Sequence, residues 1–352
     1  MKRARSLTVA AQGGALVTGD LHLSPNPRDA YRSRWFRQRL PELVQQHRVQ
    51  SLVVLGDLTE YKDEHPAALV NDLVDGFAAL SKLCEVLILK GNHDYLNADA
   101  PFFRFLGHLP NITWINSPER LELPGVGPCL FLPHERRPQE AWRDLDLRGT
   151  IFCHQTFTGA KSESGREMEG VAVSIFPRGA RVISGDVHVP QKVGPVLYAG
   201  APYTIDHGDD FDPHILLVGP EQHEVATINS GASRKVLMKV LGKEFVESLR
   251  EAKGADNAPH AQPGDVIKIR IELLPGDNTT AAEARRAARA WADDAGVELA
   301  AVQIIAPKGG ASPNARREAP SDDPALIRAY AKKMEQGQPV VAAGLKIIEK
   351  VG

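Results

Sequence analysis

Cysteine and long apolar runs are both scarce in this sequence of 352 residues, and neither sign of charge dominates it. The three cysteines, Cys84, Cys129 and Cys153, are far apart and form no C-x-x-C pair, which argues against a disulfide framework or a zinc ribbon. A formal net charge of −2 argues against a generally basic nucleic-acid coat, although it is compatible with a local basic groove. No run approaches the roughly 18 apolar residues of a membrane-spanning helix, so we expect no membrane partner.

The N-terminal segment MKRARSLTVAAQGGALV resembles a signal peptide only in its basic start and apolar continuation. Gln12 and the pair Gly13–Gly14 interrupt the apolar run, and a candidate ligand motif begins soon afterwards at Asp20. Together with the few, widely spaced cysteines, this favours a cytoplasmic location.

Five apolar runs in the first two hundred residues each stop at a glycine or at a side chain that can bind a metal. The runs lie in ALVTGD, SLVVLGD, CEVLILKGNHD, TIFCHQ and ARVISGD, and the polar residues that close them are Asp20, Asp57, the cluster Asn92-His93-Asp94, His154 and Asp186. Continuous runs of this kind predict strands that are buried on both faces. Residues 28–47 and 66–83 carry apolar side chains at helical spacing, and Pro41 is expected to bend or divide the first of these helices. Strands that alternate with helices predict a layered α/β fold whose ligands gather beyond the carboxyl ends of the strands.

The pattern changes after residue 228, which we take as the end of the first domain. Surface helices are expected at 243–254 and 281–296, and strands at 265–274 and 297–307. The chain therefore divides into a large domain at 1–228, a small α+β accessory domain at 229–305, a Pro/Gly-rich linker at 306–323 and a helical tail at 324–352.

Polar motifs follow the five predicted strands. Taken singly, each has an ordinary explanation, such as a capping aspartate with a surface histidine or a hydrogen-bonded core histidine. In chain order they are Asp20-Leu-His22, Gly56-Asp57, Gly91-Asn92-His93-Asp94, His154 and Gly185-Asp186-Val-His188. This series resembles the motifs of the calcineurin-like metallophosphoesterase superfamily, in the same order and each after a β-run. The resemblance implies a β-sandwich flanked by helices and a centre that holds two metal ions.

The resemblance also implies a role for each residue of the centre. Asp57 would bridge the two metals. Asp20, His22 and His188 would complete the first metal, and Asn92, His154 and Asp186 the second. His93 would face the scissile phosphate and assist the leaving oxygen, and Asp94 would orient His93 or a neighbouring loop from behind.

Asp186 departs from the superfamily pattern, in which this block reads G-H-x-H. A carboxylate at this position can still coordinate a metal and adds a hard oxygen ligand. We therefore expect Mn²⁺, or Mg²⁺, rather than Zn²⁺. The alternative is that Asp186 leaves the second metal weakly bound and the enzyme impaired.

Two further blocks are similar to the SbcD-type nucleases, the bacterial and phage relatives of the eukaryotic Mre-eleven repair nuclease. They are TGDLHLS with the following YRSRWFRQRL and VVLGDLTEY, and GDVHVPQKVGPVLYAGAPYTIDHGD, in which Ala201 is a second departure. The resemblance implies an Mn²⁺-dependent DNA exo/endonuclease subunit that acts in DNA repair or recombination. It would work as a homodimer within a heterotetramer with an SbcC-like, coiled-coil ABC ATPase, which the helical tail would bind. Residues 28–47 would form the dimer contact, although an ordinary core-facing helix explains the same pattern.

Candidate DNA contacts are Arg136 and Arg137 in HERRPQ, and Lys161 and Arg166 in TGAKSESGREMEG, although solvated loop residues are the favoured explanation of all four. Two other functions remain open at this stage. One is a small-molecule phosphodiesterase or phosphatase of the same fold. The other is an architectural DNA-end-binding subunit with an impaired second metal site.

Overall fold

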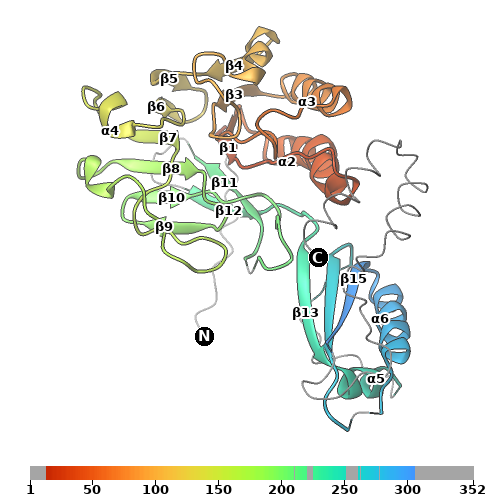
Figure 1. Cartoon of the computed structure of the whole chain (residues 1–352). Coiled ribbons are helices and arrows are strands. Elements are labelled where there is room, and N and C mark those ends of the chain that lie inside the picture. The colour runs from red at the N-terminus through yellow and green to blue at the C-terminus, as the bar shows by residue number, and fades with distance from the viewer. Residues whose placement is uncertain are drawn as a thin grey trace, which may run out of the picture.

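A computed structural model describes most of the chain, and its elements are labelled in Figure 1. It describes residues 13–209, 211–219, 225–250, 261, 263–276 and 278–305, apart from the side chains of residues 248–250. The expected linker at 306–323 and helical tail at 324–352 lie outside these residues. Within them, no helix is both long enough and apolar enough to cross a membrane.

Two six-stranded sheets form the larger part of the molecule. In spatial order the first sheet contains β12 (Val225–Asn229), β11 (His214–Val218), β1 (Ala15–Thr18), β2 (Ser51–Val54), β3 (Glu85–Leu89) and β4 (Ile112–Ile115). The second contains β5 (Glu119–Leu123), β6 (Gly127–Leu132), β7 (Thr150–His154), β8 (Arg181–Gly185), β10 (Val196–Tyr198) and β9 (Gln191–Val193). The strands β1 to β4 run parallel to one another, and so do β6, β7, β8 and β10.

All five strands expected from the apolar runs are present as β1, β2, β3, β7 and β8, but they are divided between the two sheets. Because alternate residues of a strand face opposite sides, each strand of the first sheet supplies two cores. Leu16 and Leu52 face the helices, whereas Val17 and Val53 pack between the sheets against Phe152 of β7. The continuous apolar runs therefore reflect burial on both faces, as predicted.

Helices cover the outer side of the first sheet (Figure 1). The segment expected to be one helix at 28–47 contains η1 (Pro27–Asp29), α1 (Ala30–Arg34), the π-helical turn η2 (Trp35–Arg39) and α2 (Leu40–His47). Pro41 has no N–H for the ordinary helical ladder, and the wider turn directly precedes it. The apolar stripe of this segment is buried in the core, so core packing accounts for it without a second copy of the chain. A second helix, α3 (Ala67–Leu80), completes this layer.

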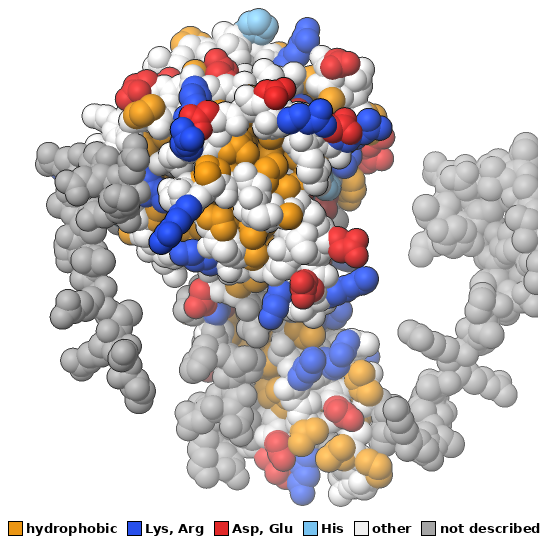
Figure 2. All heavy atoms as spheres, turned by 90° about the vertical axis from the view of Figure 1, so that its left-hand side faces the viewer, with side chains coloured by type: hydrophobic (Ala, Val, Ile, Leu, Met, Phe, Trp, Pro, Cys, Tyr) orange, Lys and Arg blue, Asp and Glu red, His pale blue; other side chains and the backbone are white. Residues whose placement is uncertain are grey.

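The outer side of the second sheet carries short elements and loops, with α4 (Pro138–Ala141) and η4 (Val173–Ile175) among them. Trp142, Phe157 and Phe176 form a separate core beneath them. On this face of the molecule apolar side chains are surrounded by charged ones (Figure 2). The short η3 (Phe102–His108) lies beside β4 of the first sheet.

The accessory part follows as β13 (Lys235–Leu241), α5 (Gly242–Arg250), β14 (Val266–Glu272), α6 (Ala281–Ala295) and β15 (Glu298–Ile305). The expected α+β domain is thus built as β-α-β-α-β, and all three strands are parallel. It has its own core around Met238, Ile269 and Trp291. A capping box between Thr280 and Glu283 begins α6, because each residue satisfies an N–H group that the first helical turn leaves unpaired. The domain boundaries remain predictions.

Candidate metal centre

The fold gathers the predicted site residues at one edge of the two sheets. Asp20, Asp57 and Asn92 follow β1, β2 and β3, while His154 ends β7 and Asp186 follows β8. Because parallel strands place their carboxyl ends at the same edge, residues distant in sequence become neighbours. Three sets of ligand atoms each lie within 4.8 Å of one another: Asp20, His22 and His188; Asp20, Asp57 and His154; and His22, Asp57 and His93.

Asp57 stands at the middle of the cluster and faces two sides. Its Oδ1 lies 3.4 Å from His154 Nε2, and its Oδ2 lies 3.6 Å from His22 Nε2. Its side chain is almost completely buried. A carboxylate whose two oxygens face different ligand groups has the geometry that a bridge between two cations requires.

On one side of Asp57, two imidazoles meet edge to face. The Nε2 atoms of His22 and His188 lie 3.1 Å apart. His188 is held from behind, because its Nδ1–H donates to Glu163 Oε1 at 2.8 Å and leaves Nε2 facing the cluster. Two ring nitrogens that converge in this way are suited to a shared cation.

On the other side, Asp186 lies among the residues predicted to hold a second metal. Its Oδ1 accepts a hydrogen bond from Asn92 Nδ2 at 3.0 Å and lies 3.7 Å from His154 Nε2. Its Oδ2 accepts a hydrogen bond from the hydroxyl of Thr156. The carboxylate that replaces the expected imidazole therefore points into the cluster, with its orientation fixed by two donors.

Several buried atoms of the cluster have no hydrogen-bond partner among the described residues. They are Asp20 Oδ2, Asn92 Oδ1, His154 Nε2 and His22 Nδ1. The ring of His154 is oriented by its Nδ1–H, which donates to the carbonyl of Leu55 at 2.5 Å, so that Nε2 faces Asp57 and Asp186. A buried polar atom without a partner is costly, and three of these four atoms are the donors that the predicted ligands would offer. The donor set of carboxylate, imidazole and amide fits divalent cations.

Backbone strain is concentrated at the same residues. Among the described residues, six that are not glycine have positive φ angles, and four of these are Asp20, His22, Asp57 and Asp186, at 52°, 41°, 54° and 78°. Conformations of this kind cost about 1–3 kcal/mol each and persist where the surrounding structure imposes them. Here they turn the side chains at the strand ends into one cluster.

Glycines provide the room for this convergence. A Cβ atom at Gly91 would lie 2.3 Å from Asp57 Oδ1, and one at Gly185 would lie 2.9 Å from His154 Nδ1. Any side chain at either position would therefore displace a member of the cluster.

The buried charges of the cluster determine its electrostatics. Burial raises the pKa of the Asp20 carboxyl to about 6, although His154 and His188 act against it. Burial also acts to raise the pKa of Asp57, but the charge of His154, whose Nε2 lies 3.4 Å away, holds it well below its usual range. The same carboxylate overcomes the effect of burial on His154 and raises its pKa well above the ordinary value. The buried carboxylates therefore stabilise positive charge at the site, and divalent cations would supply that charge.

His93 and Asp94 take different positions in the cluster. The backbone N–H of His93 donates to Asp57 Oδ1 at 2.8 Å, and its ring Nδ1 lies 2.7 Å from the carbonyl of Glu60. This contact assigns the proton to Nδ1 and leaves Nε2 available. The carboxylate of Asp94 accepts backbone N–H groups of Asp57, Leu58 and Gly91 at 3.0, 2.9 and 2.7 Å. Asp94 therefore ties together the two loops that carry the predicted ligands Asp57 and Asn92.

The four candidate DNA-contact residues lie on exposed loops. Lys161 and Arg166 are on the same loop as Glu163, whose contact with His188 brings that loop to the cluster. Arg136 donates to the carbonyl of Leu96 at 3.1 Å, whereas Arg137 lies 3.6 Å from Glu140 and is 79% exposed. The loop of Lys161 and Arg166 reaches a predicted ligand through the contact of Glu163 with His188, and the segment of Arg136 and Arg137 does so through the ring contact of His134 with His154.

Sequence reasoning missed four residues that support the cluster: Glu60, His134, Thr156 and Glu163. The ring of His134 lies 6.1 Å from that of His154, and its Nδ1 is 2.8 Å from the hydroxyl of Tyr95. Burial lowers the pKa of His134 to about 3. Single polar residues in loops carry no pattern that identifies them, although Glu60 and Thr156 lie within three residues of predicted ligands.

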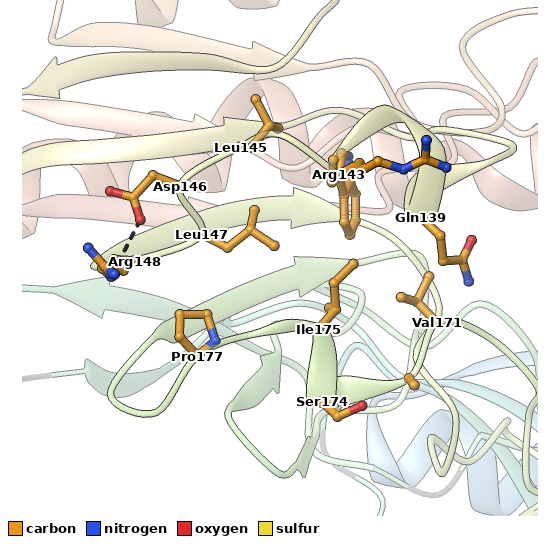
Figure 3. A pocket seen from close by; sticks show the side chains of 12 residues that line it. Gln139, Arg143, Leu145, Asp146, Leu147, Arg148, Val171, Ser174, Ile175 and Pro177 are labelled. Carbon is orange, nitrogen blue, oxygen red and sulfur yellow. Dashed lines mark ion pairs between the residues drawn. The ribbon is translucent and has the colours of Figure 1, made fainter.

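A depression of about 560 Å³ on the outer side of the second sheet is unrelated to this cluster (Figure 3). Leu147, Val171 and Ile175 line it, and Asp146 and Arg148 form a 3.6 Å ion pair at its edge. None of its lining residues is a predicted ligand.

Comparison with known proteins gives the class of this centre. The chain matches the family model of the calcineurin-like phosphoesterases over residues 15–190, the segment that carries the clustered motifs. The protein belongs to this family, whose members use divalent metal ions, and its clustered side chains are candidates for a dimetal site.

Two solved structures with detectable similarity share little sequence identity with this chain. The Pseudomonas putida nuclease MPE is 15% identical, with 61% of this chain and 87% of that chain covered and a TM-score of 0.30. A dimetal phosphatase from Danio rerio is 11% identical, with 63% of this chain and 100% of that chain covered and a TM-score of 0.37. No curated protein matches the sequence.

Proposed function

We propose that this protein is an Mn²⁺-dependent DNA exo/endonuclease subunit that hydrolyses phosphodiester bonds at a two-metal centre. The observation that carries the chemistry is the position of Asp57, whose two carboxylate oxygens face separate ligand groups. Support for DNA as the substrate comes from the sequence blocks around Asp20 and Asp186, which resemble those of SbcD-type nucleases. The small accessory domain after the catalytic part also resembles, in its place along the chain, the capping domain of those nucleases.

In this proposal Asp20, His22 and His188 hold one metal, Asn92, His154 and Asp186 hold the other, and Asp57 bridges them. Divalent ions at such a centre supply a hydroxide nucleophile at neutral pH and neutralise charge on the phosphate oxygens. Mn²⁺ is preferred, with Mg²⁺ as the alternative, because three carboxylates and an amide provide mainly hard oxygen ligands.

The chain itself supplies the proton for the leaving oxygen. The Glu60 carbonyl keeps the Nδ1 proton of His93 in place. The doubly protonated ring would therefore give its Nε2 proton to the leaving oxygen and return to the neutral imidazole. The peptide N–H of His93 also donates to Asp57, which couples the position of this residue to the proposed bridge.

The position of Asp186 bears on the architectural alternative, in which the second site is impaired. Its carboxylate points at Asn92 and His154 and is oriented by Thr156. This geometry supports a working second site.

Within this proposal the protein acts in the cytoplasm in DNA repair or recombination. It would form a homodimer within a heterotetramer with an SbcC-like coiled-coil ABC ATPase.

The test is the degradation of end-labelled linear duplex DNA by the purified protein with Mn²⁺, with and without a candidate ATPase partner. We expect cleavage that requires Mn²⁺ and falls at least about a hundredfold in His93→Ala, because general acid catalysis contributes on that scale. His93→Ala should bind Mn²⁺ normally. The exposed His108 provides the matched control, and His108→Ala should cleave like the wild type.

Other outcomes would replace the proposal. Rapid hydrolysis of a small phosphodiester without DNA cleavage would make the protein a small-molecule phosphodiesterase or phosphatase. DNA binding without hydrolysis of either substrate would favour the architectural role, and restored cleavage in Asp186→His would then identify the defect.

A further inference from the structure

A network of charged side chains, of which Glu60 alone is partly exposed, adjoins His22, a predicted metal ligand. The guanidinium of Arg32 in α1 donates from Nη1 to the carbonyl of His22 at 2.6 Å and to Glu60 Oε2 at 2.7 Å. Glu60 Oε2 lies 3.8 Å from His22 Nδ1 on the other side of the ring. Arg32 thus contacts the strained backbone of His22 directly, and it reaches the His22 ring through Glu60. The side chain of Arg32 is only 3% exposed.

The network continues from Arg32 into the accessory domain. Asp29 Oδ1 lies 3.4 Å from Arg32 Nη2 and accepts a hydrogen bond from Lys235 Nζ at 2.8 Å. Lys235 is the first residue of β13, so its backbone belongs to the accessory sheet while its ammonium lies among residues of the catalytic part. Burial acts to raise the pKa of Asp29, but Lys235 and Arg32 lower it overall, in agreement with an ionised carboxylate between two cations.

Neutral groups complete the network around these charges. The hydroxyl of Tyr31 donates to the carbonyl of Thr204 at 2.8 Å and accepts a hydrogen bond from Arg32 Nε at 3.1 Å. Thr204 accepts the backbone N–H of Lys235 at its hydroxyl, and the Lys235 ammonium also donates to the carbonyl of Ile205 at 3.0 Å. The segment that follows His188 is thereby joined to the same network.

Such a network is a poor source of stability. Desolvation of buried charges cancels much of their attraction, and well-packed apolar residues of similar volume often stabilise as much or more. What the charges provide is a fixed geometry, because loss of one partner leaves the others buried and unpaired. Here the geometry that they fix includes a strained metal ligand at one end and the start of the accessory domain at the other.

We infer that Lys235 is a positioning residue for the metal centre, which couples the docking of the accessory domain to His22 through Asp29 and Arg32. The inference rests on the proposed role of His22 as a metal ligand. The accessory domain is then a part of the metal-binding unit, and a change in its docking changes the affinity of the centre.

The test is Mn²⁺ binding to the metal-free full-length chain, measured by the electron paramagnetic resonance signal of free Mn²⁺ and by titration calorimetry. His22→Ala identifies the binding step that depends on His22. In Lys235→Met this step should weaken about tenfold, the lower end of the effect of residues that orient metal ligands. The affinity for the Mn²⁺ ion assigned to Asn92, His154 and Asp186 should change less than the affinity for the ion assigned to His22. Lys239 is the matched control, since it is exposed on the same strand, and Lys239→Met should bind Mn²⁺ like the wild type.

Asp29→Asn provides an independent arm if Lys235→Met does not fold, and it should weaken the same step. In the double variant the two effects should be less than additive, because both changes interrupt one path. Lower thermal stability with unchanged Mn²⁺ affinity in both single variants would overturn the inference and leave the network as a domain contact. An equal loss in Lys239→Met would also overturn it. Because no substrate is present, absence of DNA cleavage would contradict the proposed function and leave this inference standing.

Discussion

The side chains of the candidate metal centre are held in place by residues that lie next to the centre but are not predicted to bind a metal. Asp20, His22, Asp57 and Asp186 adopt a backbone conformation that side chains other than glycine rarely take. Strain of this kind is maintained by surrounding contacts, here that of Asp94 with the backbone N–H of Asp57 and that of Arg32 with the carbonyl of His22. Substitutions behind the ligands are therefore as informative as substitutions of the ligands.

Asp94→Ala should lower the free energy of unfolding by about 3 kcal/mol or more, because three buried backbone N–H groups lose their acceptor. Urea denaturation of the metal-free protein measures this. Asp99→Ala, at an exposed residue five positions later, should stay within about 0.5 kcal/mol of the wild type. Similar stability for the two variants would mean that Asp94 does not tie the loops together.

Glu163→Ala should weaken Mn²⁺ binding about tenfold, because the His188 ring loses the acceptor that orients it. Glu163→Gln keeps an oxygen acceptor at the same place and should lose less. Calorimetric titration with Mn²⁺ compares them, with the exposed Glu169→Ala on the same loop as the control. Equal affinities in Glu163→Ala and Glu169→Ala would exclude a positioning role for Glu163.

At the scale of the elements, close approach between helices places the layer that covers the first sheet. A Cβ atom at Gly76 of α3 would lie 2.2 Å from Cε1 of Phe36, whose ring is fully buried and packs edge to face on Phe77 at 4.9 Å. The glycine lets η2 and α3 come together over β1 and β2. Glycine is required at position 76 because there is no space for a side chain, and not because of its backbone conformation, since its φ angle is not positive.

Gly76→Ala should therefore destabilise the protein by about 1–3 kcal/mol, although alanine favours a helix over glycine by about 1 kcal/mol. Thermal or urea denaturation measures the change. Asp75→Ala, at the exposed neighbouring position in α3, is the control and should have little effect. A Gly76→Ala variant that is more stable than the wild type would show that Phe36 and η2 can shift away from α3 at little cost.

At the scale of the whole molecule, metal binding should stabilise the fold, because the clustered carboxylates and imidazoles come from both sheets. Mn²⁺ at a hundred times its dissociation constant should raise the free energy of unfolding by about 2.7 kcal/mol per site. Chelation should reverse the change. Denaturation with and without Mn²⁺ measures it, and Asp57→Ala should lose most of the increase because it removes the proposed bridge. An increase of equal size in Asp57→Ala would place the bound metal elsewhere.

Much of the fold follows from local patterns in the sequence. Apolar runs at β1, β2, β3, β7 and β8 predict strands because only strands buried on both faces need such continuous apolar character. The helices expected at 66–83 and 281–296 are present as α3 and α6, and Pro66 stands directly before the first of them. Pro41 predicts the break in the first helix, because it cannot donate to the helical ladder.

By itself, the sequence determined which residues follow the strands and in what order, and this was sufficient to predict a metallophosphoesterase. Only the tertiary structure decided that the five strands belong to two sheets and that Asp186 points at Asn92 and His154. It also decided that Glu163 contacts the predicted ligand His188, that Arg32 contacts His22, and that Lys235 joins Arg32 through Asp29. The physical reason is distance along the chain. Strand and helix patterns arise from neighbouring residues, whereas the contact of Lys235 with Asp29 joins residues 206 positions apart and depends on the packing of the whole molecule.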